Sequence, residues 1–186
     1  AALVSAFVLY VILKSRRARS QESLESERRE AAVGSLRSEW GPGTLAVCTD
    51  MIDLTGRRLT LFSDLVQHTD MSKPFPASDI LAEACKSVGA AAQARAVYVG
   101  CDGPRYESPA EVRYLQIIGG DVVGMTASSE AILMREAGVP YSCLAVVTNL
   151  GCGLSTSELH HGEVTDVMKS HGRTVVDILL AAASSI

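Results

Sequence analysis

The chain has 186 residues, 47% of them apolar and 20% charged, enough to bury the core of one domain and too apolar for a disordered chain. A net charge of −4 argues against a nucleic-acid partner, because nucleic-acid surfaces need clustered cations. The five cysteines are an odd number without C-x-x-C spacing, so they predict neither disulfides nor a zinc site. We expect a cytoplasmic protein without a metal.

The first residues differ from the rest. Residues 1–13 carry no charge and are followed at once by KSRRARS, a pattern typical of the end of a membrane span with a basic stop on its cytoplasmic side. They are fewer than the ~20 residues a crossing helix needs, so a buried helix or a non-native leader explains them equally well. We place a leader and charged linker over residues 1–30 and a domain over residues 31–186, with any membrane contact confined to residues 1–19.

From Ala31 onward, short apolar runs alternate with helical patterns. The expected strands are Leu45–Thr49, Ala94–Val99 and the runs that begin at Asp121 and Tyr141; the expected helices are Pro76–Val88, Pro109–Ile118, Ser129–Ala137 and a last one with an apolar stripe that includes Val164 and Val175. This alternation predicts an α/β fold, a central mixed β-sheet flanked by helices. Ligands of such sheets gather beyond the carboxyl ends of the strands.

The stretch GPRYES, residues 103–108, joins a predicted strand to a predicted helix. Ser108 is placed to cap that helix, and Glu111, three residues later, completes a capping box. Glu107 has no part in the box and falls where a ligand would dock, beside Tyr106, whose ring can stack on a flat molecule. From these residues alone, a solvated loop carboxylate is the more common explanation of Glu107.

A second stretch, VVTNLGCGLS, ends a predicted strand with Thr148 and Asn149 and then turns to glycines. An asparagine offers a donor and an acceptor, which suits a heterocycle carrying a carbonyl beside a ring nitrogen. The alternative is an amide that satisfies only its own turn.

In a third stretch, Met125 and Thr126 end a strand just before a helix that Ser128 or Ser129 would open. A hydroxyl and free backbone N–H groups at a helix start favour an anion. Alone this motif is weak, and Met125 by itself would be assigned to the core.

Taken together, residues 103–155 closely resemble the trimeric purine nucleoside phosphorylase and methylthioadenosine phosphorylase family. AAVGSL, GPGTLAVCTDMIDLT and HTDMSKPF match the same family in the same order. The resemblance implies an α/β phosphorylase fold and a homotrimer that converts a purine nucleoside and phosphate into the free base and ribose 1-phosphate. It implies no cofactor beyond inorganic phosphate as co-substrate.

The resemblance also assigns roles to residues. At the base, Tyr106 would lie against the purine ring, Glu107 would bond its pyrimidine edge, and Asn149, with Thr148 beside it, would recognise the base and assist its departure.

For the sugar and phosphate, Met125 would lie under the ribose and Thr126 would bind phosphate. His161 would face the 5′ end of the sugar, and Ala32 would fall in a phosphate and ribose loop.

By the family resemblance, position 149 is Asn in phosphorylases of 6-oxopurines and Asp in those that act on adenine nucleosides. Members that prefer 5′-methylthioadenosine carry an aspartate where this chain has Gly151. This favours inosine, guanosine or methylthioinosine. GPRYES is closer to the methylthio-nucleoside branch, so 5′-methylthioadenosine phosphorolysis stays an alternative.

The chain departs from the family before AAVGSL, where members carry a glycine-rich start and an Arg and His pair that grips phosphate. We therefore expect a domain truncated at its N-terminus, with an exposed apolar sheet edge. A non-catalytic purine-binding paralogue or fragment is the second alternative.

Overall fold

The computed structural model describes residues 31–57, 59–62, 64–155 and 161–185, apart from the side chains at 161 and 163. The predicted leader, linker and membrane contact lie outside these residues, so the boundary near Ala31 stays a prediction. Within the described residues, no helix combines the length and the apolar character needed to cross a membrane.

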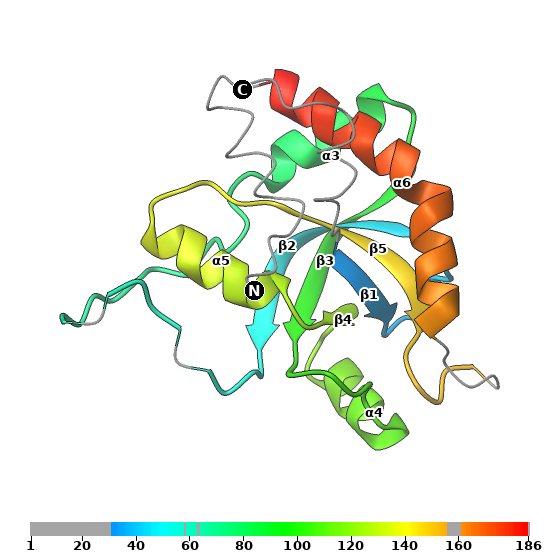
Figure 1. Cartoon of the computed structure of the whole chain (residues 1–186), viewed down its shortest axis with the longest axis horizontal. Coiled ribbons are helices and arrows are strands. Elements are labelled where there is room, and N and C mark those ends of the chain that lie inside the picture. Colours follow the sequence, from blue (N-terminus) through cyan, green and yellow to red (C-terminus); the bar gives the residue numbers. More distant parts are fainter. Residues whose placement is uncertain (1–30, 58, 63, 156–160, 186) are drawn as a thin grey trace.

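Strands and helices alternate along the described chain, as the sequence predicts (Figure 1). In chain order the elements are β1 (Ala31–Ser35), β2 (Leu45–Asp53), α3 (Ser78–Ser87), β3 (Ala92–Gly100), α4 (Pro109–Ile117), β4 (Val122–Gly124), α5 (Ala127–Glu136), β5 (Cys143–Leu150) and α6 (His161–Ser184). The predicted α/β fold with a mixed sheet is confirmed.

The described strands close on themselves in the order β1–β4–β3–β2–β5. Pairing is parallel for β2–β3, β3–β4 and β1–β5, and antiparallel for β1–β4 and β2–β5. The expected exposed sheet edge is therefore wrong for these strands, because β1 pairs with β4 on one side and β5 on the other. The strand β1 was not among the predicted elements.

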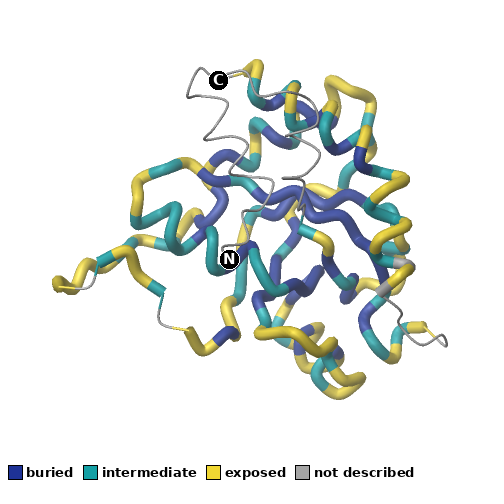
Figure 2. The backbone as a smooth tube through the Cα atoms, in the orientation of Figure 1, coloured by how far each residue is buried: buried dark blue, intermediate teal, exposed yellow. Residues whose placement is uncertain are grey.

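Alternation along the strands divides the core between two faces. On β2, Ala46 and Cys48 pack with the buried Tyr98 of β3 and with α5, whereas Leu45 and Val47 pack under α3 and α6. The short helix α4 covers Val99 and neighbouring residues of the sheet. Figure 2 shows the strands as the most buried part of the chain and the outer side of α4 as exposed.

Two helix starts differ from the prediction. The helix α3 begins at Ser78 rather than Pro76, and α5 begins at Ala127, with Thr126 as its cap residue, rather than at Ser129. Ser128 and Ser129 cap nothing, and no partner of their buried hydroxyls is found among the described residues. The α4 prediction holds, since Ser108 and Glu111 form the expected capping box.

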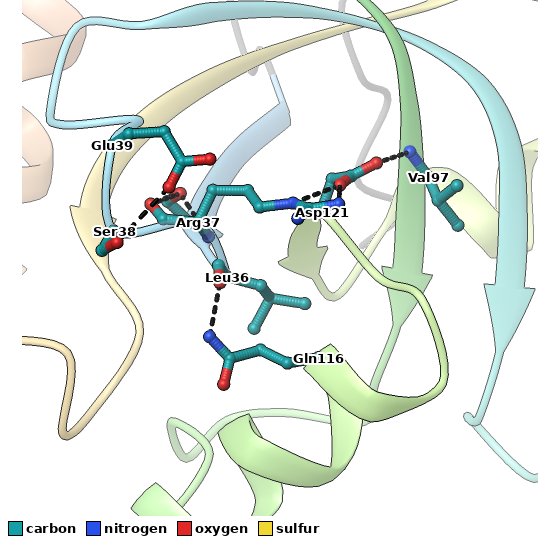
Figure 3. A network of polar contacts seen from close by, with 8 residues as sticks. Leu36, Arg37, Ser38, Glu39, Val97, Gln116 and Asp121 are labelled. Carbon is teal, nitrogen blue, oxygen red and sulfur yellow. Dashed lines mark hydrogen bonds and ion pairs between the residues drawn. The ribbon is translucent and has the colours of Figure 1, made fainter.

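A polar cluster fastens the end of β1 to β3 and β4 (Figure 3). The carboxylate of Asp121, just before β4, accepts hydrogen bonds from Arg37 Nε at 2.6 Å and Val97 N at 2.8 Å. On the same turn the backbone carbonyl of Asp121 accepts from Leu36 N, and Gln116 Nε2 donates to the Leu36 carbonyl at 2.7 Å. We call these five residues the Asp121 cluster.

The segment between β2 and α3 extends away from the strands (Figure 1). It contacts the end of α5, where Arg135 donates to the Asp70 carbonyl at 2.9 Å. Several of its apolar side chains face solvent, among them Leu65 and Val66, which are 58% and 74% exposed.

Candidate active site

A cavity of about 440 Å³ opens where β1, the end of β5 and the segments after β3 and β4 meet. Seven of the eight predicted site residues line it: Ala32, Tyr106, Glu107, Met125, Thr126, Thr148 and Asn149. His161 begins α6, but its side chain lies outside the described part of the chain. Stretches more than a hundred residues apart thus converge on one space, at strand ends as the sequence predicts.

A bulge in β5 gives the cavity two neighbouring polar residues. In the β1–β5 pairing, Val33 lies opposite Val147 but Gly34 lies opposite Asn149, so Thr148 is an extra residue. Successive residues of a regular strand point to opposite faces. Because of the bulge, Thr148 and Asn149 both line the cavity.

The Asn149 amide is fixed in place yet keeps unused bonding capacity. Thr148 Oγ1 donates to Asn149 Oδ1 at 2.8 Å, and Asn149 Nδ2 donates to the Leu150 carbonyl at 3.1 Å. An amide offers two hydrogens and two lone pairs, so one of each remains for a ligand. The residue is 9% exposed, so a ligand would meet this pair largely away from water.

A glycine makes room beside this amide. Gly34 pairs with Asn149 on one side and with Val123 on the other. A Cβ at Gly34 would lie 3.2 Å from Asn149 Nδ2 and 3.3 Å from the Val123 side chain, so even alanine would crowd these two neighbours. Within AAVGSL, a stretch that carries the family resemblance, position 34 therefore has to be a glycine for the cavity wall to pack as it does.

Ala32 lies in β1 rather than in the predicted loop. It still lines the cavity, because β1 runs along the wall between β4 and β5. Residues 31–35 form a strand since both of their backbone edges find partners in the sheet.

The loop before α4 separates two acids. Glu111 is committed to the helix cap and to Arg105, whose Nη1 and Nη2 donate to its carboxylate at 2.8 and 2.7 Å. Those bonds, Arg105 first, lower the pKa of Glu111 to about 2. Glu107 lines the cavity instead.

The Glu107 carboxyl is half-buried, and desolvation is the main reason why its pKa is raised above the usual range. The negative charge of Glu111 raises this pKa further, whereas Arg105 lowers it. With Arg105 held by Glu111, the Glu107 carboxyl is available to a ligand.

Two further predicted residues come from different segments: Met125 follows β4, and Tyr106 lies in the loop between β3 and α4. Met125 packs against the loop that carries Tyr106, and a Cβ at Gly103 would lie 2.4 Å from its Sδ. Tyr106 is 38% exposed, at the mouth of the cavity, where a ring could stack on a ligand.

The start of α5 corrects one expectation. The N–H groups of Thr126 and Ala127 both donate to the Tyr98 hydroxyl at 3.2 Å, so these two amides are not free for an anion. Among the described lining residues there is no Lys, Arg or His, while Glu107 and Glu130 are acidic.

Glu130 and Val164 line the cavity without having been singled out as site residues. Glu130 lies four residues after Thr126, one helical turn along the same face of α5, and this spacing was the available signal. Val164 was assigned to core packing, because an apolar stripe on a helix does not reveal which of its members meets a cavity.

Among the described residues, no group of three or more His, Cys, Asp or Glu side chains could hold a metal ion.

A family model described as the Phosphorylase superfamily matches residues 29–184, and the chain belongs to that superfamily.

The relatives include two kinds of phosphorylase. The chain is 37% identical over 162 residues to a probable 6-oxopurine nucleoside phosphorylase of Moorella thermoacetica, covering 84% of this chain and 62% of that protein. It is also 37% identical over 163 residues to the 6-oxopurine nucleoside phosphorylase of Pyrococcus furiosus, covering 82% and 62%. A probable S-methyl-5′-thioinosine phosphorylase of Methanothermobacter thermautotrophicus is 36% identical over 158 residues, covering 81% and 53%. The chain thus spans 53–62% of the length of these relatives.

Solved structures agree on the fold. A methylthioadenosine phosphorylase sourced from an antarctic soil metagenomic library superimposes with a TM-score of 0.76 at 30% identity, covering 83% of this chain and 57% of that one. A mutant adenosine/methylthioadenosine phosphorylase from Schistosoma mansoni, in complex with adenine, gives 0.76 at 26% identity, covering 83% and 63%. The resemblance and the fold inferred from the sequence are both confirmed.

Proposed function

We propose that this chain carries the base-recognition half of a purine nucleoside phosphorylase that acts on 6-oxopurines such as inosine, guanosine or methylthioinosine. The observation that carries the proposal is the convergence of Tyr106, Glu107 and Asn149 on one cavity. The products would be the free base and ribose 1-phosphate.

The proposed roles follow from the bonding capacity of each group. The spare Asn149 hydrogen would donate to O6 and its spare lone pair would accept from a protonated N7, so that negative charge on the departing base is stabilised. The Glu107 carboxylate would accept from N1–H, with Tyr106 stacked on the ring. Met125 and Ala32 would contact the ribose, and His161 its 5′ end.

Specificity for 6-oxopurines rests on the same two groups. Adenine lacks N1–H and carries an amine in place of O6, so it would leave Glu107 and Asn149 unpaired in a half-buried site. Discrimination of this kind reaches about 10⁴-fold. The alternative substrate is 5′-methylthioadenosine, which is supported by the structural similarity to a methylthioadenosine phosphorylase.

One observation favours a second candidate, a protein that binds purines without phosphorolysis. The described cavity lining holds two acids and no cation, and two amides at the start of α5 are taken by Tyr98. Thr126 would then hold phosphate only together with groups from outside the described residues or from another subunit.

The deciding experiment follows hypoxanthine release from inosine with and without inorganic phosphate, together with hypoxanthine binding by calorimetry. Phosphate-dependent release supports the phosphorylase. Hypoxanthine binding without release supports the second candidate. If hypoxanthine is neither released nor bound, both candidates are contradicted. Adenosine, methylthioinosine and 5′-methylthioadenosine are compared in parallel, and a preference for an adenine nucleoside would refute the assignment of Asn149.

We also propose that the chain forms a homotrimer in the cytoplasm. Exposed apolar side chains on the segment between β2 and α3, including Leu61, Leu65 and Val66, support an assembly. All five cysteines are free thiols, which suits a reducing compartment. Light scattering after gel filtration should give three times the chain mass, and a monomer at micromolar concentration would contradict the trimer.

A further inference from the structure

The phenol of Tyr98 connects the core to the cavity wall. Tyr98 lies on β3 with none of its surface exposed, packed in the same core cluster as Ala127. Its hydroxyl accepts hydrogen bonds from Thr126 N and Ala127 N, each at 3.2 Å. Thr126 lines the cavity, so one oxygen of the core holds two consecutive amides at its edge.

The end of β4 is shaped to admit this hydroxyl. A Cβ at Gly124 would lie 2.3 Å from the Tyr98 oxygen and 3.0 Å from Cζ, too close for any side chain. The cavity-lining residues Gly124, Met125 and Thr126 are therefore set between the phenol on one side and the cavity on the other.

The hydroxyl also replaces an ordinary helix cap. The first N–H groups of a helix lack partners within it, and the Thr126 side chain makes no capping bond to α5. Without the phenol oxygen, two amides at the buried start of α5 would have no partner in the core. Burial is the main reason why the pKa of Tyr98 is raised, so the group stays a neutral phenol.

We infer that Tyr98 is a positioning residue: its hydroxyl fixes the backbone from Gly124 to Ala127 and thereby places the Thr126 side chain at the end of the cavity where phosphate would bind. The part that concerns phosphate rests on the proposed function. The part that concerns the backbone does not.

The test uses the full chain with Tyr98→Phe, which keeps the ring and removes the oxygen. The matched control is Tyr141→Phe, which removes a buried phenol oxygen from the same core cluster, one that donates to Glu130 instead. Amide hydrogen exchange at Thr126 and Ala127 should be about tenfold faster in Tyr98→Phe, as expected for the loss of a hydrogen bond of ordinary strength, and unchanged in the control. Unchanged exchange in Tyr98→Phe overturns the inference.

The second readout separates positioning from stability. Phosphate KM should rise about tenfold in Tyr98→Phe while inosine KM changes less than about twofold, because only the wall near Thr126 moves. Accelerated exchange with both KM values unchanged would mean that the hydroxyl only stabilises the fold, and would overturn the positioning role. If the unaltered protein neither turns over inosine nor shows a phosphate-dependent shift of the Thr126 amide, the proposed function fails, and hydrogen exchange still decides whether Tyr98 holds the wall.

A second variant guards against a Tyr98→Phe protein that does not fold. Gly124→Ala places a methyl group against the Tyr98 hydroxyl and should displace it. It should also accelerate exchange at Thr126 and Ala127. Protection equal to that of the unaltered chain would contradict the inference.

Discussion

Two polar clusters lie against β1, and they differ in how completely their groups are paired. In the Asp121 cluster, both carboxylate oxygens and the neighbouring carbonyls have protein partners (Figure 3). In the cavity, Asn149 keeps a hydrogen and a lone pair unused, and Glu107 receives no hydrogen bond from another described side chain. Full pairing stabilises a fold, whereas spare capacity beside a cavity is what a ligand needs.

The comparison predicts opposite phenotypes for the two clusters, and the largest effect belongs to Asn149. Asn149→Ala should lower kcat for inosine by about 10²–10³-fold, the loss typical of removing one group that stabilises developing negative charge. The free energy of unfolding should change little by comparison. Steady-state kinetics and urea unfolding measure the two quantities on the same preparation.

Asn149→Asp is the matched control for this position. It keeps the size of the side chain and should shift preference toward adenine nucleosides, because a carboxylate would accept from the exocyclic amine of adenine, whereas the proposed role of the amide is to donate to O6. Equal losses on inosine and adenosine would show that position 149 does not read the base.

The Asp121 cluster should show the reverse. Asp121→Asn replaces one acceptor oxygen by an amide NH2 group, a donor that would face the Arg37 or Val97 N–H, and should lower the free energy of unfolding by about 2 kcal/mol. Activity per folded molecule should stay within about threefold, since none of these groups lines the cavity. Chemical denaturation followed by circular dichroism measures the change.

The control for Asp121 is another Asp–Arg pair of the same chemistry. Asp102 pairs with Arg57 at 2.7 Å, but both side chains are about half exposed. Asp102→Asn should cost less than about 0.5 kcal/mol. Equal losses for the two variants would remove burial as the reason for the difference between the clusters.

The sequence predicted the residues of the cavity better than the backbone that arranges them. The sequence could predict the strand ends, the Ser108 cap and the glycines, because each depends on local chemistry. The bulge at Thr148 was not, since an extra residue shows only against the register of β1, 115 residues away. The bonds from Thr126 and Ala127 to Tyr98 were missed for the same reason, because a phenol on β3 caps a helix three elements later.

A third prediction concerns pH. In its proposed role, Glu107 would accept from N1–H of the base only when ionised. Burial raises the pKa of Glu107 in the free protein, so as the pH is lowered, base affinity should begin to fall at a pH above the usual pKa of a glutamate, about 4.3. This fall, the acid limb of the pH profile, should appear at higher pH in kcat/KM than in kcat, because a bound N1–H donor favours the ionised carboxylate. Glu107→Gln should abolish it, and a limb that persists in this variant belongs to another group.

The smallest effect separates the two charges that flank Glu107. Glu111 raises the pKa of Glu107 and Arg105 lowers it, while the bidentate pair between them keeps Arg105 away from the cavity. Glu111→Gln removes a negative charge and releases Arg105, so the acid limb should move to lower pH. Arg105→Ala leaves the charge of Glu111 in place and should move the limb to higher pH.

Since Arg105 and Glu111 are both partly exposed, these shifts should be a fraction of a pH unit and should shrink as ionic strength rises from about 0.01 M to 1 M. The pH dependence of kcat/KM for the two variants, measured at both salt concentrations, tests the sign as well as the size. Shifts in the same direction would mean that the loop moves on substitution, in which case the capping box rather than the charge of Glu111 holds Glu107 at the cavity.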